Sequence, residues 1–376
     1  MRQHSGVELT SSDALALRMR SLLLEPTSAA TPVATRSVAE VVAWFGAMQA
    51  QDYASGLWSL GARLPSMTRT QVEEALERRE ALRTWPMRGT IHLVPAADAR
   101  WMVEVLGERA LTQASRRRAH LGLDESTAER AVEVLGDALA GGARLTRAQC
   151  LDALTGAGIP ATGQRGYHLL WFASQRGVVC IAPNRGSEQT FARLDEWVEH
   201  SHHPDREEAL ATIACRYVRS HGPATRRDFI GWTGLTAADA DAALAAAADT
   251  VTTVAVDGHA MLVAADALAA RPVPMLDGVL VLPGFDEYLL GYKDRSLMVD
   301  PEHAQAIVPG GNGVFQATVV RAGRVIGTWK RSSTATRTVV TVLPLVPLRS
   351  RDLREVDAAF ERYAHFVHTP VQVRWP

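Results

Sequence analysis

Long apolar runs, signal-peptide features and paired cysteines are all missing from this sequence of 376 residues. No stretch approaches the ~18 apolar residues that a membrane-spanning helix needs, and residues 1–30 lack the basic-then-apolar layout of a signal peptide. The three cysteines, Cys150, Cys180 and Cys215, are widely spaced and form no C-x-x-C pair, which argues against a disulfide framework or a structural zinc. We therefore expect a cytoplasmic protein with no membrane partner, no metal and no other cofactor.

Acidic residues are absent from two long stretches, although the whole chain has a net charge of only −1. No Asp or Glu occurs from His303 to Ser350 or from Ala110 to Leu123. The basic residues of these stretches are Arg116, Arg117, Arg118, Arg321, Arg324, Lys330, Arg331, Arg337 and Arg349. Because phosphate neutralisation is local, a neutral molecule with basic stripes can still dock on a polyanion. Lysine is nearly absent; the planar fork of arginine suits phosphate contacts, but the arginine bias fits a GC-rich coding sequence equally well.

Helices closed by a short hairpin recur three times in the first three-quarters of the chain. The third copy is the clearest. Its apolar spacing predicts a helix over 206–221, two shorter helices beginning at Thr225 and Thr236, and strands over 251–256 and 259–263. Asp257-Gly258 between the two strands is the strongest short hairpin signal. This order is typical of a winged helix.

The other two copies are less regular. The second has a hairpin of strands 178–182 and 189–193, and the first has strands at 83–85 and 90–94 joined across Arg88-Gly89. The last hundred residues are rich in strands, with helix predicted only at 352–366. We therefore predict an α+β fold with three tandem winged-helix motifs followed by a C-terminal β-barrel. The predicted boundaries are 1–122, 123–203, 204–272 and 273–376.

Four phrases are more specific than a generic winged helix. They are MQAQDY at 48–53, RGTIHLV at 88–94, PGFDEYLLGYKDR at 283–295 and IGTWKR at 326–331. Taken in this order, they resemble the AlkZ/YcaQ-like tandem winged-helix DNA glycosylase family of bacteria, over almost the whole chain. The resemblance implies a central DNA channel, removal of alkylated bases and unhooking of interstrand crosslinks at N7 of guanine. It also implies a catalytic Gln-x-Gln signature, which Gln49 and Gln51 match.

The chemistry of two neutral amides limits the substrate. Residues i and i+2 project about 200° apart on a helix but share a side in an extended segment. Gln49 and Gln51 can therefore converge only if the helix that begins at Ser37 ends near Met48. An amide is a poor base, yet an N7-alkylated guanine is already cationic and leaves as a neutral base. For such a substrate, the amides need only orient a water and stabilise an oxocarbenium-like centre for hydrolysis to proceed.

This motif predicts a monofunctional hydrolase that is selective for cationic lesions in double-stranded DNA. It contains no lysine for a Schiff base, and the chain is expected to act as a monomer. The alternative role for the two glutamines is polar residues at a helix end that bond to backbone. The alternative function for the chain is a non-catalytic winged-helix DNA-binding or regulatory protein.

Further polar residues are candidates for DNA contact or for a second functional surface. The DNA-binding candidates are Arg88, His92, Arg116, Arg117, Arg118, Arg185, Lys330 and Arg331. Arg88 and Arg185 fall at hairpin tips, where wings meet phosphate or where arginines are simply solvated. The possible second site is Asp286, Glu287, Tyr292, Lys293, Asp294 and Arg295, which can equally form a salt-bridge cluster between domains. Trp329 either stacks on DNA or is buried, and three histidines at 200–203 are interpreted as a solvated linker rather than a metal site.

Overall fold

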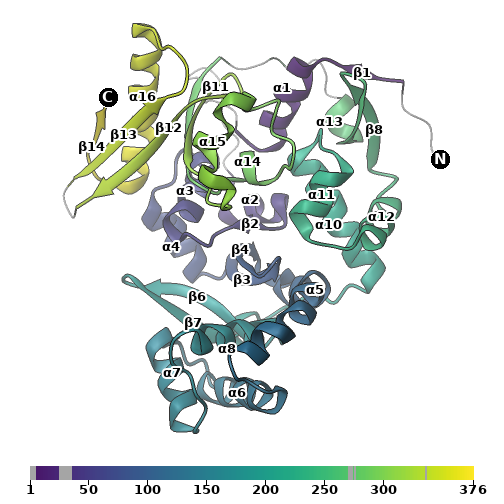
Figure 1. The fold of residues 1–376 in the computed structure, drawn as a ribbon, viewed down its shortest axis with the longest axis vertical. Coiled ribbons are helices and arrows are strands. Elements are labelled where there is room, and N and C mark those ends of the chain that lie inside the picture. Colours follow the sequence, from purple (N-terminus) through teal and green to yellow (C-terminus); the bar gives the residue numbers. More distant parts are fainter. Residues whose placement is uncertain (1–5, 25–35, 270–273, 275–276, 335–336) are drawn as a thin grey trace.

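The computed structural model describes residues 6–24, 36–269, 274, 277–334 and 337–376. Helices and hairpins alternate over most of the chain, and a separate sheet forms its C-terminal part, so the fold is mixed α+β (Figure 1). Within these ranges, no helix combines the length and the apolar character that crossing a membrane requires. The predicted boundary between residues 272 and 273 lies outside the described residues.

The first part of the chain has its helix starts fixed by side-chain caps. Its elements are β1 (Glu8–Leu9), α1 (Ser11–Ser21), α2 (Val38–Phe45), β2 (Met48–Gln49), α3 (Tyr53–Arg63), α4 (Arg69–Glu77), β3 (Ala81–Met87) and β4 (Thr90–Pro95). Capping boxes at Thr10, Ser37 and Thr68 begin α1, α2 and α4. The predicted turn at Arg88-Gly89 joins β3 to β4, and both turn residues have positive φ, as a tight hairpin of this hand requires.

The second hairpin joins the first in one sheet. The elements here are a short 3-10 turn (Ala96–Asp98), α5 (Ala99–His120), α6 (Glu125–Ala138), β5 (Leu145–Thr146), α7 (Arg147–Gly156), α8 (Gln164–Gln175), β6 (Val179–Arg185), β7 (Glu188–Arg193) and α9 (Leu194–Trp197). The strand order β2-β4-β3-β6-β7-β5 makes a continuous six-stranded sheet, with Arg83 of β3 opposite Ile181 of β6. This merger was not predicted from the sequence.

The third hairpin forms a separate sheet with the N-terminal strand. Its elements are α10 (Arg206–His221), α11 (Arg226–Thr233), α12 (Ala237–Ala246), β8 (Val251–Val256), β9 (His259–Ala264) and α13 (Ala265–Ala269). Asp257 and Gly258 make the predicted turn, with φ of 47° and 78°. β1 pairs in parallel with β8, and Leu9 and Leu17 share a small apolar cluster with Val254. The opening segment of the chain therefore packs on the third hairpin.

The C-terminal part is an open sheet covered by one helix. Its elements are β10 (Val279–Leu282), α14 (Glu287–Leu290), a 3-10 turn (Pro301–His303), α15 (Ala304–Ile307), a second 3-10 turn (Pro309–Gly311), β11 (Ala317–Arg321), β12 (Arg324–Ser333), β13 (Thr338–Pro344), α16 (Ser350–Val367) and β14 (Val371–Arg374). The strand order runs from β10 to β14, and these two edges do not pair with each other among the described strands. The predicted β-barrel is therefore an open half-barrel in the structure.

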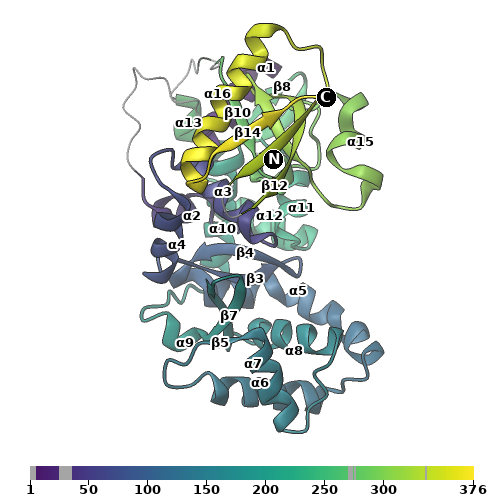
Figure 2. The same cartoon turned by 90° about the vertical axis from the view of Figure 1, so that its left-hand side faces the viewer.

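Helix α16 closes one face of this half-barrel (Figure 2). Phe360 and Tyr363 on its apolar side contact the ring of Trp329 on β12. Trp329 is only 3% exposed and donates its indole N–H to Leu282 O at 2.9 Å. Of its two predicted roles, it takes the buried structural one.

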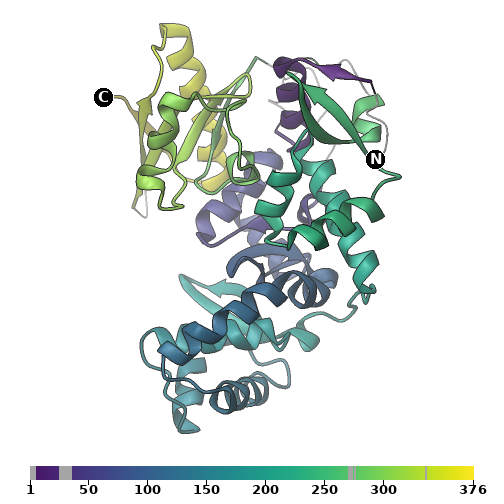
Figure 3. The ribbon, with the colours of Figure 1, turned by 45° about the vertical axis from the view of Figure 1, so that its right-hand side comes forward.

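Helices α2 and α3 lie between the C-terminal half-barrel and the helices α10 to α12. α2 packs on α10, and α3 packs on β10 and α16. In Figures 1 and 3 the C-terminal half-barrel and the helices α10 to α12 flank this central region, with α6, α7 and α8 at the far end. The short strand β2, which carries the first glutamine of the motif, therefore lies where these parts meet.

Candidate active site

The Gln-x-Gln segment is extended because α2 ends early. The helix finishes at Phe45, and its C-cap Gly46 has a φ of 79°, a conformation that suits glycine. Met48 and Gln49 then form β2, which pairs with Leu93 and His92 of β4. Helix α3 begins at once, because Asp52 caps it by accepting the Ser55 N–H at 2.7 Å. The predicted end of the helix before Met48 is confirmed.

Both glutamine side chains are held by backbone N–H groups. Gln49 Oε1 accepts the N–H of Gln51 at 3.2 Å, and Gln51 Oε1 accepts the N–H of Ile91 at 3.0 Å. Gln49 is 7% exposed, whereas Gln51 is exposed. Each carbonyl oxygen keeps a second lone pair, and neither NH₂ group has a hydrogen-bond partner among the described residues. The backbone bonding of the alternative role is present, and it also fixes the position of both amides.

A buried carboxylate lies directly behind Gln49. Glu287, at the start of α14, accepts the N–H of Gln49 on Oε1 at 2.8 Å. Its Oε2 accepts the indole N–H of Trp232 at 2.9 Å and lies 3.4 Å from His221 Nε2. Burial by itself would raise the pKa of Glu287, but the bond and charge of His221 and the Gln49 N–H outweigh it and lower the pKa to about 2. Glu287 therefore remains ionised.

The His92 side chain lies in the protein interior. It is fully buried, its Nδ1 lies 2.9 Å from Thr90 O, and its Nε2 lies 3.2 Å from Arg88 Nη2. Burial, with a further contribution from the Arg88 charge, lowers the pKa of His92 to about 3, so the ring is neutral at ordinary pH. In this structure the ring is therefore not exposed to solvent, and its two nitrogens are occupied by Thr90 and Arg88.

Arg88 is turned inward from its hairpin tip. Its Nη1 donates to Gly231 O of α11 at 3.4 Å, and its Nε is buried without a partner among the described residues. Burial lowers the pKa of Arg88. It is therefore neither an exposed wing-tip arginine nor a solvated one.

The phrase at 283–295 divides between two tasks. Asp286 forms a buried ion pair with Arg63, whose two terminal nitrogens lie 2.9 Å from its two carboxylate oxygens. This pair ties the half-barrel to α3, as the salt-bridge alternative predicted for the block. Tyr292 is buried and donates to His221 O at 2.8 Å. Glu287, by contrast, belongs to the glutamine motif, while the side chains of Lys293, Asp294 and Arg295 line a cavity next to it.

The other DNA-binding candidates differ in exposure. Arg116 and Arg117 are exposed on α5, and Arg185 is exposed at the β6–β7 tip. Arg118, by contrast, is buried over the ring of Phe172 and pairs with Glu125. Lys330 and Arg331 are exposed on β12.

Arg331 also reaches the end of the motif. Its guanidinium lies 3.8 Å from the Asp52 carboxylate and 3.0 Å from the Tyr363 hydroxyl. The basic half-barrel strand therefore adjoins the residue that follows Gln51.

Sequence reasoning missed two residues of this site, His221 and Trp232. His221 ends α10 and Trp232 lies on α11, far in sequence from both phrases that they support, and neither forms a recognisable motif. Among the described residues, no group of three or more His, Cys, Asp or Glu side chains could hold a metal ion. His202 of the linker bonds Asp98 at 2.8 Å instead.

Comparison with known proteins identifies the class of protein that carries this fold and these amides. A model of the AlkZ-like DNA glycosylase family matches residues 42–366, so the chain belongs to this family. Among its relatives is the interstrand DNA cross-link repair glycosylase of Streptomyces sahachiroi, 28% identical over 334 residues that span 84% of this chain and 86% of that protein. The solved structure of the S. sahachiroi DNA glycosylase AlkZ has the same fold, with a TM-score of 0.80 and 24% identity over 98% of this chain and all of that one.

Proposed function

We propose that this protein is a DNA glycosylase that hydrolyses the N-glycosidic bond of cationic N7-alkylated purines, including crosslinked ones. One observation carries the proposal. On the segment between α2 and α3, the amide oxygens of Gln49 and Gln51 are both held by backbone N–H groups, and the ionised carboxylate of Glu287 accepts the backbone N–H of Gln49. Family membership and the crosslink-repair name of the S. sahachiroi relative support the same reaction.

The leaving group determines what the protein must supply. An N7-alkylated guanine carries a positive charge and departs neutral, so no acid is needed. The free lone pairs of Gln49 Oε1 and Gln51 Oε1 accept the hydrogens of a water. Its oxygen bonds to the anomeric carbon as the glycosidic C–N bond breaks with its electron pair going to the base, and the surplus proton of the water is released to solvent. Because the amides are held before substrate arrives, this orientation requires little rearrangement.

Glu287 adds an electrostatic contribution that the motif itself lacks. As the glycosidic bond breaks, positive charge moves from the base to the sugar. The buried Glu287 anion, which accepts the Gln49 backbone N–H, stabilises the positive charge on the sugar. Its effect is strong because a low-dielectric interior screens charges poorly. The same anion favours a cationic lesion over a neutral base such as uracil. The carboxylate accepts three N–H groups and does not act as a base.

The reaction ends with hydrolysis and involves no strand-cleaving lyase step. A lyase step requires an amine that forms a Schiff base with the sugar. The chain has two lysines, Lys293 and Lys330, and neither lies in the glutamine motif. The helices and hairpins serve as winged helices that hold the duplex as a monomer, with Arg116, Arg117, Arg185, Lys330 and Arg331 as the exposed cations that meet phosphate.

A base-release assay tests the proposal. The protein is incubated with a duplex carrying one N7-methylguanine, and in parallel with an N7-crosslinked duplex, and strand breaks are counted after mild alkali. We expect release by the wild type and a loss of about 10²-fold or more in a Gln49→Ala, Gln51→Ala double variant.

Two results would contradict it. Equal release by the double variant would remove the amides from the mechanism. Tight retention of undamaged DNA of one sequence at physiological salt, without release from any alkylated duplex, would favour the non-catalytic DNA-binding alternative.

A further inference from the structure

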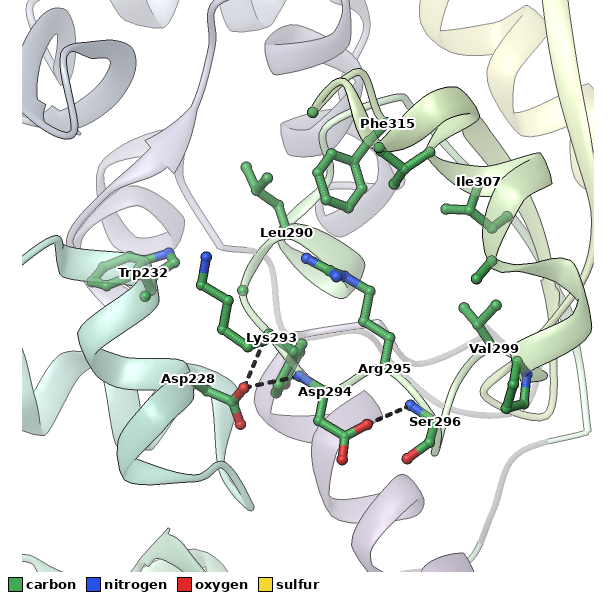
Figure 4. Close-up of a pocket in the computed structure, with 18 of the residues that line it drawn as sticks. Asp228, Trp232, Leu290, Lys293, Asp294, Arg295, Ser296, Val299, Ile307 and Phe315 are labelled. Atoms are coloured by element: carbon green, nitrogen blue, oxygen red, sulfur yellow. Dashed lines mark hydrogen bonds between the residues drawn. The ribbon is translucent and has the colours of Figure 1, made fainter.

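A cavity of about 690 Å³ takes no part in the reaction proposed above, and its lining includes Arg88 and Trp232, which contact His92 and Glu287 of the candidate site. α11 forms one wall, and residues 290–296 and the segment from Val299 to Phe315 form the others (Figure 4). Trp232 and Phe315 stand on opposite sides of it. Its volume is that of a small-molecule or nucleotide-sized site.

Two cations point into the same part of this cavity. Figure 4 shows the ends of Lys293 and Arg295 in the space between Trp232 and Phe315. The Lys293 ammonium has no hydrogen bond or ion pair with any described residue, and its chain packs on Gly231, where an added Cβ would come within 2.2 Å of Lys293 Cε. Arg295 lies over the ring of Phe315 and donates only its Nε, to Leu289 O. Both side chains are thus held in place with their charge unpaired.

The acidic residues of the cavity are already occupied. Asp228 Oδ1 accepts the backbone N–H groups of Lys293 at 2.6 Å and Asp294 at 3.3 Å, and Oδ2 serves the cap at Thr225. Asp294 accepts the N–H of Ser296 at 2.9 Å. Both carboxylates point away from the cationic ends (Figure 4). Asp228 and Asp294 still act on Arg295 through their charge, but no carboxylate of the described residues forms an ion pair with Lys293 or Arg295.

Arg88 connects the cavity to the glutamine motif. It lines the cavity, and its Nε is buried without a partner. Its Nη2 lies 3.2 Å from His92, which is paired with Gln49 across the β2–β4 ladder. A group bound by these cations would therefore lie close to the reacting nucleotide.

We infer that this cavity binds a backbone phosphate of the DNA next to the lesion, through Lys293, Arg295 and Arg88. The inference rests on the proposed function, since it requires DNA on this face. Phosphate fits better than the lesion base, because three cations repel a cationic purine and attract an anion. Gly311 and Gly313 line the cavity with open space around them, so they carry no side chain that would obstruct a passing strand.

Binding to a duplex that cannot be cleaved tests this inference apart from catalysis. The probe is a short duplex with one tetrahydrofuran abasic-site analogue, and its Kd is measured over a series of salt concentrations for the wild type, Lys293→Met and the charge-keeping control Lys293→Arg. We expect Lys293→Met to reduce the slope of log K against log salt by about 1, the loss of one phosphate contact, and Lys293→Arg to leave it unchanged.

Methylphosphonate substitution then locates the contact. Phosphates flanking the analogue are replaced one at a time by the neutral methylphosphonate on both strands. One position should weaken binding by the wild type but not by Lys293→Met, because the variant has already lost that interaction.

An unchanged salt slope in Lys293→Met, or the absence of any position that separates it from the wild type, would overturn the inference. So would binding of inorganic phosphate that depends on Lys293 while duplex binding does not, since the cavity would then serve a free anion. The base-release assay runs separately on alkylated DNA, so its failure would count against the proposed function alone.

Discussion

At the residue scale, we expect substitutions of two adjacent buried carboxylates, Asp286 and Glu287, to affect base release differently. Glu287 bonds the Gln49 backbone, while Asp286 bonds Arg63 and Ser59, caps α14 and has no hydrogen bond with the Gln49 or Gln51 amide. Glu287→Gln removes the anion and keeps the shape. We expect base release to fall by about a hundredfold and the free energy of unfolding to fall by about 1–3 kcal/mol, because an amide NH₂ then faces N–H donors.

Asp286→Asn provides the matched control for this prediction. It leaves Arg63 buried with a weaker partner and should lower the free energy of unfolding by about 3–5 kcal/mol. Release per folded molecule should stay within a few-fold of the wild type. Single-turnover release and urea unfolding, both measured below each variant's Tm, separate the two effects. Equal release defects in the two variants would show that Glu287 acts only through stability.

At the element scale, the early end of α2 places the motif. Gly46 has a φ of +79°, and a Cβ there would lie 3.1 Å from Arg216 Cδ and 3.3 Å from Ile213 Cδ1. Gly46→Ala should therefore cost about 1–3 kcal/mol of unfolding free energy and also reduce base release, because strain relaxes by moving residues 47–51. Gly186→Ala is the control: its φ is +63°, but nothing lies within 4 Å of an added Cβ. If the two substitutions cost the same and neither alters release, α2 does not position the motif.

Local sequence patterns were enough to predict several helices and hairpins, whereas the arrangement of the candidate site depends on contacts between residues far apart in the sequence. Asp257-Gly258 and Arg88-Gly89 gave two hairpins correctly because a tight turn needs only adjacent residues with positive φ. The break before Met48 followed from the need to bring two glutamines to one side.

The bond from Gln49 to Glu287 spans 238 residues and could not be predicted from spacing. His92 was named as a candidate for DNA contact, yet its side chain is fully buried. Its surroundings include the charges of Arg88 and of Glu287, and Glu287 comes from a distant part of the chain, which strand alternation does not reveal.

At the scale of the whole molecule, charge segregation along the sequence is only partly preserved in space. Arg321 lies in the acid-free stretch, yet it contacts Asp277, Asp352 and Glu355, which precede and follow that stretch. Lys330 and Arg337 are exposed on the β12–β13 hairpin without an ion pair among the described residues. The basic surface is therefore narrower than the sequence suggests, and DNA affinity should depend on a few contacts and hence on salt.

Folding stability of the whole molecule should decline in mild acid because His92 is buried in its neutral form. Its pKa is about 3 in the folded protein against an ordinary value of 6.5. Below pH 6.5 the unfolded chain binds a proton that the folded one does not, so stability is complete above 6.5 and falls toward 3. The limiting slope is about 1.4 kcal/mol per pH unit. Burial, aided by Arg118 and Arg117, likewise lowers the pKa of His168 to about 4, and this group acts in the same direction.

Glu287 is an acid buried in its charged form, whereas His92 is a base buried in its neutral form. Both make the folded protein less stable as the pH falls, but Glu287 acts at lower pH. Its pKa falls from 4.5 to about 2 on folding, so its contribution is complete above 4.5 and is lost toward 2. Between pH 6.5 and 4.5 the loss of folding stability therefore comes mainly from the buried histidines. We expect His92→Gln to be less stable than the wild type at neutral pH, through its lost bonds, but to decline less steeply over this interval. Urea unfolding across the interval measures both slopes, and parallel curves for the two proteins would mean that His92 is protonated in the folded state.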